Sequence, residues 1–169
     1  MTHIPIRIAM VEDAASIANT MKTVAKNLED PEIYVTDDEA FICRHIKDQG
    51  FTELAECDGG VVGFLIVHIP GNGPENLGRD AGLPDRELPF TAHMESAAVL
   101  PAYRGHGIQR MLMMEAEKEL RRRGFHYAVG TVSPKNPYSM ENCLKLGYLT
   151  AAVRNKYGSL LRNIVVKRL

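Results

Sequence analysis

The sequence has few cysteines, no long hydrophobic run and no excess of charge of either sign, and these absences exclude several classes of protein. Cys43, Cys57 and Cys143 lack CxxC spacing, which argues against a disulfide framework or a zinc site and is typical of free thiols in a reducing compartment. The longest strongly apolar run, Val61–Val67, is far shorter than the roughly 20 residues that cross a bilayer. The N-terminal segment Met1–Arg7 has no apolar core of the kind found in signal peptides. We therefore predict a cytoplasmic protein with no metal and no membrane partner.

The balance of charges also argues against a nucleic-acid partner. The 20 Lys and Arg residues are offset by 21 Asp and Glu residues, which gives a formal net charge of −1. No overall field would attract a polyanion. One basic stretch, Arg121–Arg123, falls at the end of a predicted helix, where cations interact favourably with the helix dipole.

The length and the hydrophobic periodicity predict one α/β domain over residues 1–169. We expect a first strand at residues 4–8 and a helix over 14–28, where apolar residues recur at helical spacing. A capping box of Thr36 and Glu39 predicts a second helix that ends at Gly50. Two apolar runs, 51–57 and 61–68, flank the sequence Asp58-Gly59-Gly60 and predict a β-hairpin.

The second half of the chain alternates strands and helices after a long interruption. Residues 70–92 are rich in Gly and Pro; such a loop is either functional or mobile, or else a disordered tip without a role. The remaining expected elements are strand 94–100, helix 108–123, strand 125–132, helix 136–146 and two closing strands near 148–150 and 163–166. The sheet is therefore expected to be mixed, with helices packed against it.

A glycine-rich turn joins strand 94–100 to the following helix and has the features of an anion site. The turn reads Arg104-Gly105-His106-Gly107-Ile108-Gln109. Backbone N–H groups at a helix start lack internal partners, and glycines let a ligand approach them closely. A dinucleotide-binding fingerprint would need Gly or Ala at position 110, where Arg110 stands, and a P-loop would need a G-K-[S/T] sequence that is missing.

Two segments resemble the Gcn5-related N-acetyltransferase (GNAT) family. The segment from Val99 to Gln109 resembles the family pattern [Q/R]-x-x-G-x-[G/A], except that Gln109 stands where Gly or Ala is usual. The second segment is similar to the family's N-x-x-[A/S]-x-x-x-Y-x-K-x-G-[F/Y] pattern through Asn136, Ser139, Cys143, Lys145, Gly147 and Tyr148. The order of the elements resembles the family over nearly the whole chain.

This resemblance implies a GNAT-like acyl-CoA N-acyltransferase fold, a central twisted mixed sheet flanked by helices, with acetyl-CoA as acyl donor. The strand before the turn would separate from the next parallel strand, and backbone groups of Ala97 and Val99 would pair with the pantetheine amides. Asn136 and Ser139 would contact the cofactor arm from the other side, or serve only as an N-cap and a helix-face hydroxyl. The pyrophosphate would lie on Arg104, Gly105, His106, Gly107, Ile108 and Gln109.

The family's chemistry is direct attack of an amine on the thioester, which requires a base for the amine and a proton for the departing sulfur. Glu95 lies two residues from His93 on the strand that faces the gap, and we take Glu95 as the candidate general base. The alternative is a charged residue at a strand entrance. Cys143 occupies the position of the family's acidic tyrosine; it is a candidate acid or a small core residue.

The function predicted from these observations is transfer of an acetyl or short acyl group to a primary amine. The acceptor is expected to be a small molecule or a peptide, bound by loop 70–92 and the first two helices. A non-catalytic CoA-binding sensor is the alternative, because Gln109 and Cys143 depart from the family pattern. A homodimer is common in the family, and the sequence does not decide it.

Overall fold

The computed structural model describes residues 4–169, and the first three residues of the N-terminal segment considered for a signal peptide lie outside this range. Within these described residues, seven strands form one sheet in the order β1-β2-β3-β4-β5-β7-β6. Among the strands that the structure describes, only β4 and β5 run parallel, and all other neighbours are antiparallel. The predicted α/β class with a mixed sheet is therefore confirmed. The strands are β1 (Ile6–Ile8), β2 (Gly50–Cys57), β3 (Gly60–His68), β4 (Thr91–Val99), β5 (Tyr127–Val132), β6 (Leu149–Lys156) and β7 (Leu160–Arg168).

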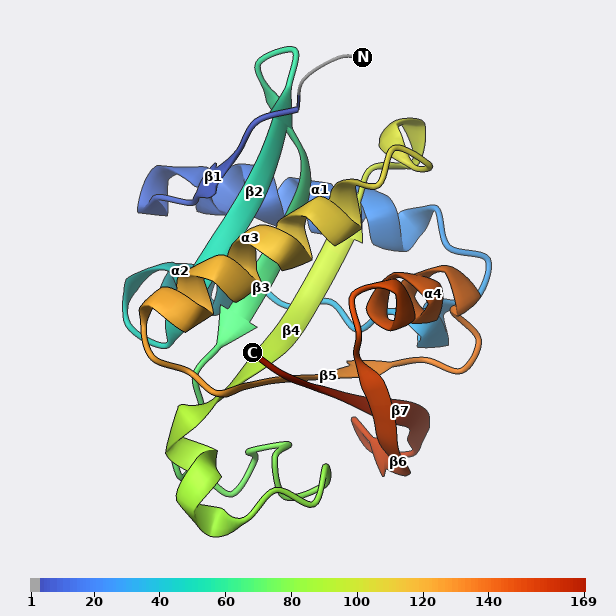
Figure 1. Ribbon diagram of the computed structural model, residues 1–169. Helices are drawn as coiled ribbons and strands as arrows, with labels where there is room; N and C mark the ends of the chain where they lie inside the picture. The colour runs from blue at the N-terminus through green and yellow to red at the C-terminus, as the bar shows by residue number, and fades with distance from the viewer. Residues whose placement is uncertain (1–3) are drawn as a thin grey trace.

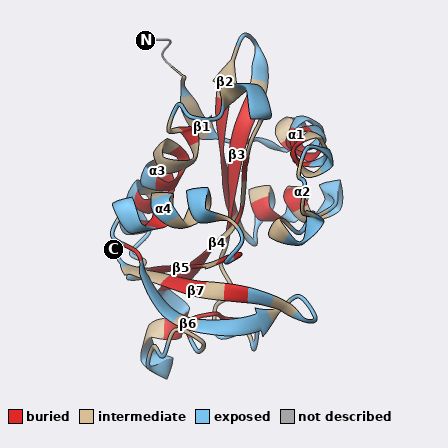
Figure 2. Cartoon of the chain, turned by 90° about the vertical axis from the view of Figure 1, so that its right-hand side faces the viewer, coloured by how far each residue is buried: buried red, intermediate tan, exposed pale blue. Residues whose placement is uncertain are grey.

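In the described part of the chain, four α-helices cover the two faces of the sheet in pairs (Figures 1 and 2). The helices are α1 (Ala14–Lys26), α2 (Glu39–Lys47), α3 (Ile108–Arg122) and α4 (Pro137–Lys145). Helices α1 and α2 lie on one face and α3 and α4 on the other (Figure 2). None of the helices in residues 4–169 has the length and apolar character needed to cross a membrane.

Each face of the sheet has its own hydrophobic core. On the α1–α2 face, Ile17 and Met21 of α1 pack with Ile42 of α2 against Leu54 and Phe64 of the sheet. The core on the α3–α4 face contains Phe51, Leu65, Ile108, Leu112, Leu120 and Tyr148. Because residues of one strand alternate between these two cores, the strands read as nearly continuous apolar runs in the sequence.

The predicted β-hairpin is confirmed and depends on its turn residues. Strands β2 and β3 pair antiparallel, with Cys57 opposite Gly60. Asp58 and Gly59 between them both have positive φ, 51° and 78°. Two consecutive positive φ angles are what a type I′ turn requires, and Asp followed by Gly is a favoured sequence for it.

The start and end of α2 differ from the prediction. Asp38, not Thr36, is the N-cap, since its side chain accepts a hydrogen bond from the Phe41 N–H at 2.7 Å. Gly50 does not end the helix; it is the first residue of β2. A Cβ at Gly50 would lie 1.8 Å from the carbonyl oxygen of Val67, so glycine is required by the close approach of β3 and not by a helix end.

The Gly/Pro-rich segment is packed against the sheet, and strand β4 begins at Thr91 instead of Met94. Asn76 is buried and donates hydrogen bonds to the carbonyls of Gly71 and Leu88. Leu88 lies in a short 3₁₀ helix, Asp85–Phe90, and is also buried. The segment therefore forms hydrogen bonds across its own length, which a disordered tip would not do.

The second half otherwise follows the predicted order. Gly124 and Gly147 have φ of 84° and 87° after the ends of α3 and α4, as expected for helix-terminating glycines. The closing strands β6 and β7 are longer than predicted. Each arginine of the basic stretch Arg121–Arg123 pairs with Glu117 or Glu119 on the same helix.

Candidate functional site

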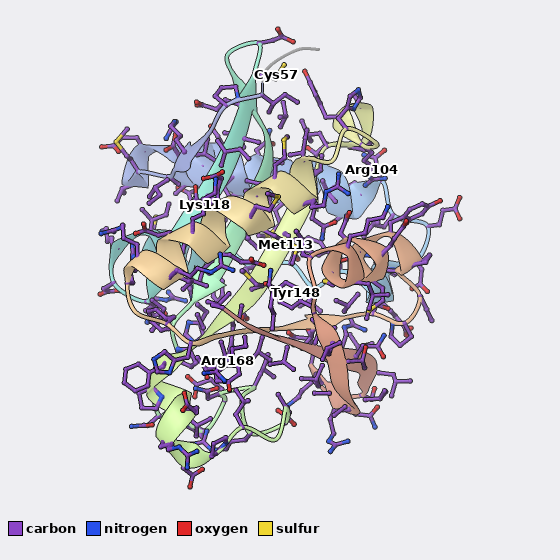
Figure 3. All side chains as sticks on the ribbon, viewed as in Figure 1. Cys57, Arg104, Met113, Lys118, Tyr148 and Arg168 are labelled. Carbon is purple, nitrogen blue, oxygen red and sulfur yellow. The ribbon has the colours of Figure 1, made fainter. Side chains whose placement is uncertain are left out.

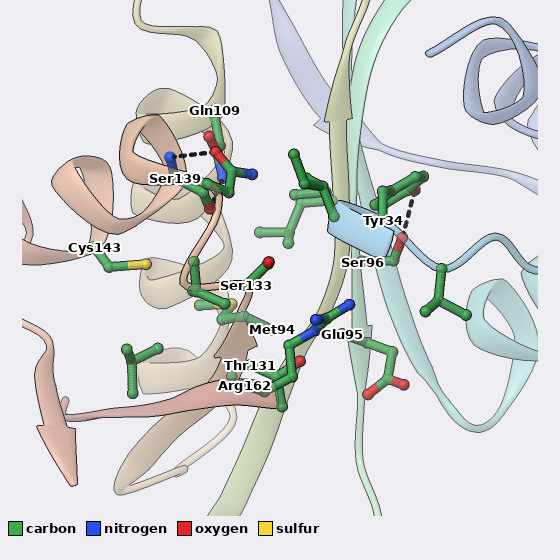
Figure 4. A pocket seen from close by; sticks show the side chains of 18 of the residues that line it. Tyr34, Met94, Glu95, Ser96, Gln109, Thr131, Ser133, Ser139, Cys143 and Arg162 are labelled. Atoms are coloured by element: carbon green, nitrogen blue, oxygen red, sulfur yellow. Dashed lines mark hydrogen bonds between the residues drawn. The ribbon is translucent and has the colours of Figure 1, made fainter. Parts of the chain in front are cut away.

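The site lies where strands β4 and β5 stop pairing. Their parallel register covers only Thr91–Met94 of β4 against Tyr127–Gly130 of β5. Beyond this point a cavity of about 180 Å³ opens between the strands. Its walls include residues 94–97 of β4, residues 130–133 at the end of β5, the segment before α2, and parts of α3 and α4 (Figure 4). A gap in a sheet exposes backbone groups that are normally paired, so this edge can bind a ligand through them.

A β-bulge at Glu95 marks the point of separation. Val67 of β3 is opposite Met94, while its neighbour Ile66 is opposite Ser96. Glu95 is therefore an extra residue in β4. A bulge bends the strand, leaves the extra residue unpaired and redirects its side chain. The bulge thus accounts for both the divergence of β4 from β5 and the position of the Glu95 side chain beside the cavity.

The free edge of β4 presents the backbone groups that the sequence assigned to the cofactor arm. The N–H of Leu100 donates to the carbonyl of Val62 in β3 at 2.8 Å. Successive backbone N–H groups point to opposite sides of a strand. The N–H groups of Ala97 and Val99 therefore point away from β3, toward the open gap.

The glycine turn forms a row of unpaired donors at the start of α3. Gly105 and Gly107 have φ of 82° and 74°, and a Cβ at Gly105 would meet no atom within 4 Å. Within residues 4–169 no acceptor pairs with the backbone N–H groups from Gly105 to Arg110. Arg104 lies at the same end of α3 (Figure 3). Unpaired N–H groups at the positive end of a helix dipole form an anion site.

Gln109, which departs from the family pattern, connects α3 to α4. Its Nε2 donates to Oγ of Ser139 at 3.0 Å, and its Oε1 accepts from Nδ2 of Asn142 at 2.9 Å. The side chain is thus held against α4, and the Gln109 backbone N–H stays free. Asn136 is the N-cap of α4, accepting from the Ser139 N–H at 3.1 Å; with Ser139 it also lines the cavity.

Glu95 is held in the ionised form by His93. Nε2 of His93 accepts the N–H of Leu77 at 2.9 Å; the proton of the neutral imidazole is therefore on Nδ1, which lies 3.4 Å from Oε2 of Glu95. Burial alone would raise the pKa of Glu95. The contact with His93 and the neighbouring His68 and His45 outweigh burial and lower the pKa below its usual value.

The three histidines are in contact but do not form a proton relay. Nδ1 of His45 faces the Phe41 carbonyl at 2.8 Å and must donate, so its Nε2 accepts from Nδ1 of His68 at 2.9 Å. Nε2 of His93 accepts a hydrogen bond from the backbone N–H of Leu77, and a backbone amide does not relay protons. Within the described chain, no three potential ligand side chains are arranged to hold a metal ion.

A second carboxylate, Asp37, lines the cavity and was not predicted from the sequence. Burial, and the negative charges of Glu95 and Asp38, raise the pKa of Asp37 to about 6. It precedes the N-cap of α2, and no local motif distinguishes it from the neighbouring acidic residues. Only the packing of this segment against β4 brings Asp37 and Glu95 to one cavity.

Two tyrosines that the sequence did not single out also line the cavity. The hydroxyl of Tyr34 lies 2.7 Å from Oγ of Ser96 (Figure 4). The hydroxyl of Tyr157 lies 3.0 Å from Oγ1 of Thr131. Burial raises the pKa of both phenols, so both remain protonated at neutral pH.

Cys143 lies on the cavity wall and is 4% exposed. Burial raises the pKa of its thiol to about 11. Two tyrosines lie nearby in the sequence. Burial, and the negative charge of Glu117, raise the pKa of the Tyr148 phenol. Tyr138 is 80% exposed on α4. In the described residues of α4, Cys143 is the only ionisable side chain that lines the cavity.

The sequence model of the acetyltransferase (GNAT) family matches residues 13–148 of the chain. A search of the curated proteins finds no significant match.

Three solved structures with the same fold are described as acetyltransferases, one of them as putative. The structure of yncA from Salmonella typhimurium, a putative acetyltransferase with acetyl-CoA, has a TM-score of 0.72 and 23% identity, covering 99% of this chain and 95% of that one. The ribosomal-protein-S18-alanine N-acetyltransferase of Escherichia coli has a TM-score of 0.74 and 16% identity, with 98% and 94% covered. PaiA N-acetyltransferase of Thermoplasma acidophilum, solved with coenzyme A, has a TM-score of 0.68 and 18% identity, with 99% and 100% covered.

The burial of Cys143 predicts a slow thiol. Cys43 and Cys57 are partly exposed, whereas Cys143 is buried with a pKa of about 11. Compared with a reference thiol near pKa 8.5, the thiolate fraction at neutral pH falls by about 100-fold or more. Labelling the native protein with a charged maleimide, read by mass spectrometry, should modify Cys43 and Cys57 first and Cys143 only on unfolding. The Cys57→Ser variant is the control, because it should lose one of the two fast labelling events and leave Cys143 unlabelled. Rapid labelling of Cys143 in the native protein would show that its thiol is not buried.

Proposed function

The chain belongs to the acetyltransferase (GNAT) family and is therefore an acyl-CoA-dependent N-acetyltransferase, and we propose that its reaction takes place in the cavity where β4 and β5 separate. The observation that supports this location is the loss of pairing after Met94, next to the row of free N–H groups at the start of α3. Acetyl-CoA, which is bound by the yncA structure, is the proposed donor.

The free backbone groups fit the two parts of the proposed donor. We place the pyrophosphate on the N–H groups of residues 105–110, with Arg104 beside them, because this is the anion site. The amides of the pantetheine arm would pair with the free edge of β4 at Ala97 and Val99. Asn136 and Ser139 line the same cavity from α4, so they form the opposite wall for that arm.

Glu95 is the proposed general base. An acceptor amine arrives as an ammonium ion at neutral pH and must lose a proton before its nitrogen can attack the thioester carbonyl. The lowered pKa of Glu95 keeps its carboxylate charged at neutral pH. His93 acts as a positioning residue, since its Nδ1–H holds the carboxylate and its Nε2 is fixed by Leu77.

The departing sulfur recovers a proton as the carbon–sulfur bond breaks. A thiol of pKa about 11 is a weaker acid than an ordinary thiol near 8.5. Proton transfer from Cys143 to the sulfur would be unfavourable, since the two pKa values differ by about 2.5. We therefore propose that Cys143 offers at most an S–H hydrogen bond, and that the second proton of the attacking nitrogen neutralises the sulfur.

Of the two departures that favoured a non-catalytic CoA-binding sensor, the one at Gln109 does not disturb the anion site. Gln109 is turned to Ser139 and Asn142 on α4, and its backbone N–H is free, so its side chain does not obstruct the anion site. A carboxylate pair beside the gap is more useful to a catalyst than to a CoA sensor. For location we propose the cytoplasm, which the three free cysteines support.

Binding of acetyl-CoA should stabilise the protein strongly. A ligand at about 100 times its Kd adds roughly 2.7 kcal/mol, and each kcal/mol raises the Tm of a domain of this size by about 2–4 °C. Thermal denaturation with acetyl-CoA should therefore show a rise of roughly 5–10 °C, with little effect from ATP or NAD.

A pair of glycines provides the matched control. Gly107 and Gly124 lie at opposite ends of α3 with φ of 74° and 84°, so replacement by Ala should cost each about the same, roughly 1–2 kcal/mol. Gly107→Ala should in addition weaken acetyl-CoA binding at least 10-fold, while Gly124→Ala should not. Equal affinity in both variants would remove the glycine turn from the cofactor site.

The pH dependence of the reaction should report on Glu95 and His93. Glu95→Gln removes the base and should lower kcat/KM by about 10²–10⁴-fold, with little change in the affinity for acetyl-CoA. His93→Gln removes a neighbour that lowers the pKa of Glu95. The acidic limb of its pH–rate profile should therefore move to higher pH, with activity recovering in alkaline buffer. If the acidic limb of the pH–rate profile of His93→Gln coincides with that of the unaltered enzyme, Glu95 is not the group that titrates in this limb.

A further inference from the structure

Arg162 of β7 is a buried cation that has no ion-pair partner among the described residues. The side chain is 4% exposed and lines the cavity. Its guanidinium donates to the carbonyls of Leu161 and Glu32, which uses two of its five N–H groups. No carboxylate in residues 4–169 lies within ion-pair distance of it. A buried charge without a counter-ion is costly, so this position favours an anion supplied by a ligand.

The same cavity contains a negative pair. Glu95 is ionised, and its charge helps to raise the pKa of Asp37 to about 6, which means that the two carboxylates repel each other through the cavity. A ligand cation between them would relieve this repulsion. In Figure 4 the Arg162 guanidinium points into the space between β4 and β5, on the side of Glu95 and Ser96.

Tyr157 links the two charged regions. Its phenol is affected by the charges of Glu95, Arg162 and Asp37 together, and the Arg162 guanidinium lies 5.8 Å from its ring centroid. Tyr157 also has φ of 52°, a conformation that costs a residue other than glycine roughly 1 kcal/mol or more. The turn between β6 and β7 thus places an aromatic ring in the wall of the cavity.

We propose that the acceptor is an amine that also carries a carboxylate, as a free amino acid does, with its ammonium group bound between Asp37 and Glu95 and its carboxylate bound by Arg162. This assignment rests on the proposed function, since it names the acceptor class of that same site. A guanidinium has the planar fork that matches a carboxylate with two parallel hydrogen bonds.

A small zwitterion fits the site better than a peptide or a phosphate ester. The peptide following an N-terminal residue has an amide where an amino acid has its carboxylate, and an amide would leave the Arg162 charge without a counter-ion. An aminoalkyl phosphate would bring up to two negative charges next to Asp37 and Glu95.

The reaction balances with this acceptor. The ammonium group gives one proton to Glu95, and the free amine then forms a nitrogen–carbon bond with the thioester carbonyl. The carbon–sulfur bond breaks, a second nitrogen proton passes to the sulfur, and the products are an N-acetylamino acid and CoA thiol. The carboxylate stays bound to Arg162 throughout and takes no part in bond making.

The experiment compares matched acceptors with the full-length enzyme, measuring thiol release from acetyl-CoA. The panel contains the standard amino acids, their amides, the corresponding decarboxylated amines, short peptide amides and aminoalkyl phosphates. We expect at least one amino acid to exceed its own amide in kcat/KM by about 10- to 100-fold, the range for loss of a hydrogen-bonded charge.

Two arginines on adjacent strands provide the variants. Arg162→Gln should bring the amino acid and its amide to within about threefold of each other, with acetyl-CoA affinity unchanged. Arg154 of β6 lies opposite Arg162 in the strand register and is exposed, so Arg154→Gln should keep the preference. Arg162→Lys retains the positive charge but not the planar guanidinium, so it should keep part of the preference for the amino acid over its amide. If the Arg162 variants do not fold, the panel measured with the unaltered enzyme still decides the question.

The outcomes separate this inference from the proposed function. Amides or simple amines acetylated as well as amino acids would overturn the inference and leave the acetyltransferase intact, as would a preference for peptide amides or for aminoalkyl phosphates. Thermal stabilisation by acetyl-CoA without acetylation of any amino acid would also overturn it. Absence of both stabilisation and turnover would instead overturn the proposed function.

Discussion

The site depends on one structural constraint, the loss of hydrogen bonding between β4 and β5 after Met94. Backbone groups that leave a sheet must find other partners or a ligand. The bulge at Glu95 produces this separation, and its consequences are a free strand edge, a cavity and a carboxylate at one point. The start of α3 lies at the same cavity and adds a row of unpaired backbone N–H groups to it.

The charged groups around this gap are held by structure distant in sequence. His93 can present a proton to Glu95 only because Leu77, in the Gly/Pro-rich segment, occupies its other nitrogen. Asn76 in turn fixes that segment through the carbonyls of Gly71 and Leu88. The segment therefore contributes to the site by holding His93 in one tautomer, in addition to any contact with an acceptor. On the other side, the β6–β7 hairpin brings Arg162 to the same cavity.

Local sequence signals predicted the elements whose causes are local. The turn at Asp58 and Gly59, the positive-φ glycines after α3 and α4, and the element order were all predictable, and so was the glycine turn. Positions set by tertiary packing were not. Gly50 is required by the Val67 carbonyl of another strand, and nothing in their local sequence distinguishes Asp37 and Arg162 from neighbouring charged residues. Their roles arise only when three separate segments meet at the gap.

Amide hydrogen exchange with and without acetyl-CoA observes directly the backbone groups that are proposed to bind the cofactor. Saturating acetyl-CoA should slow exchange at Gly105–Arg110 and at Ala97 and Val99. The amides of Thr91–Met94, where β4 is still paired with β5, should change little. Unchanged exchange at both the glycine turn and the free edge of β4, or protection confined to another surface, would show that the cofactor does not bind in this gap.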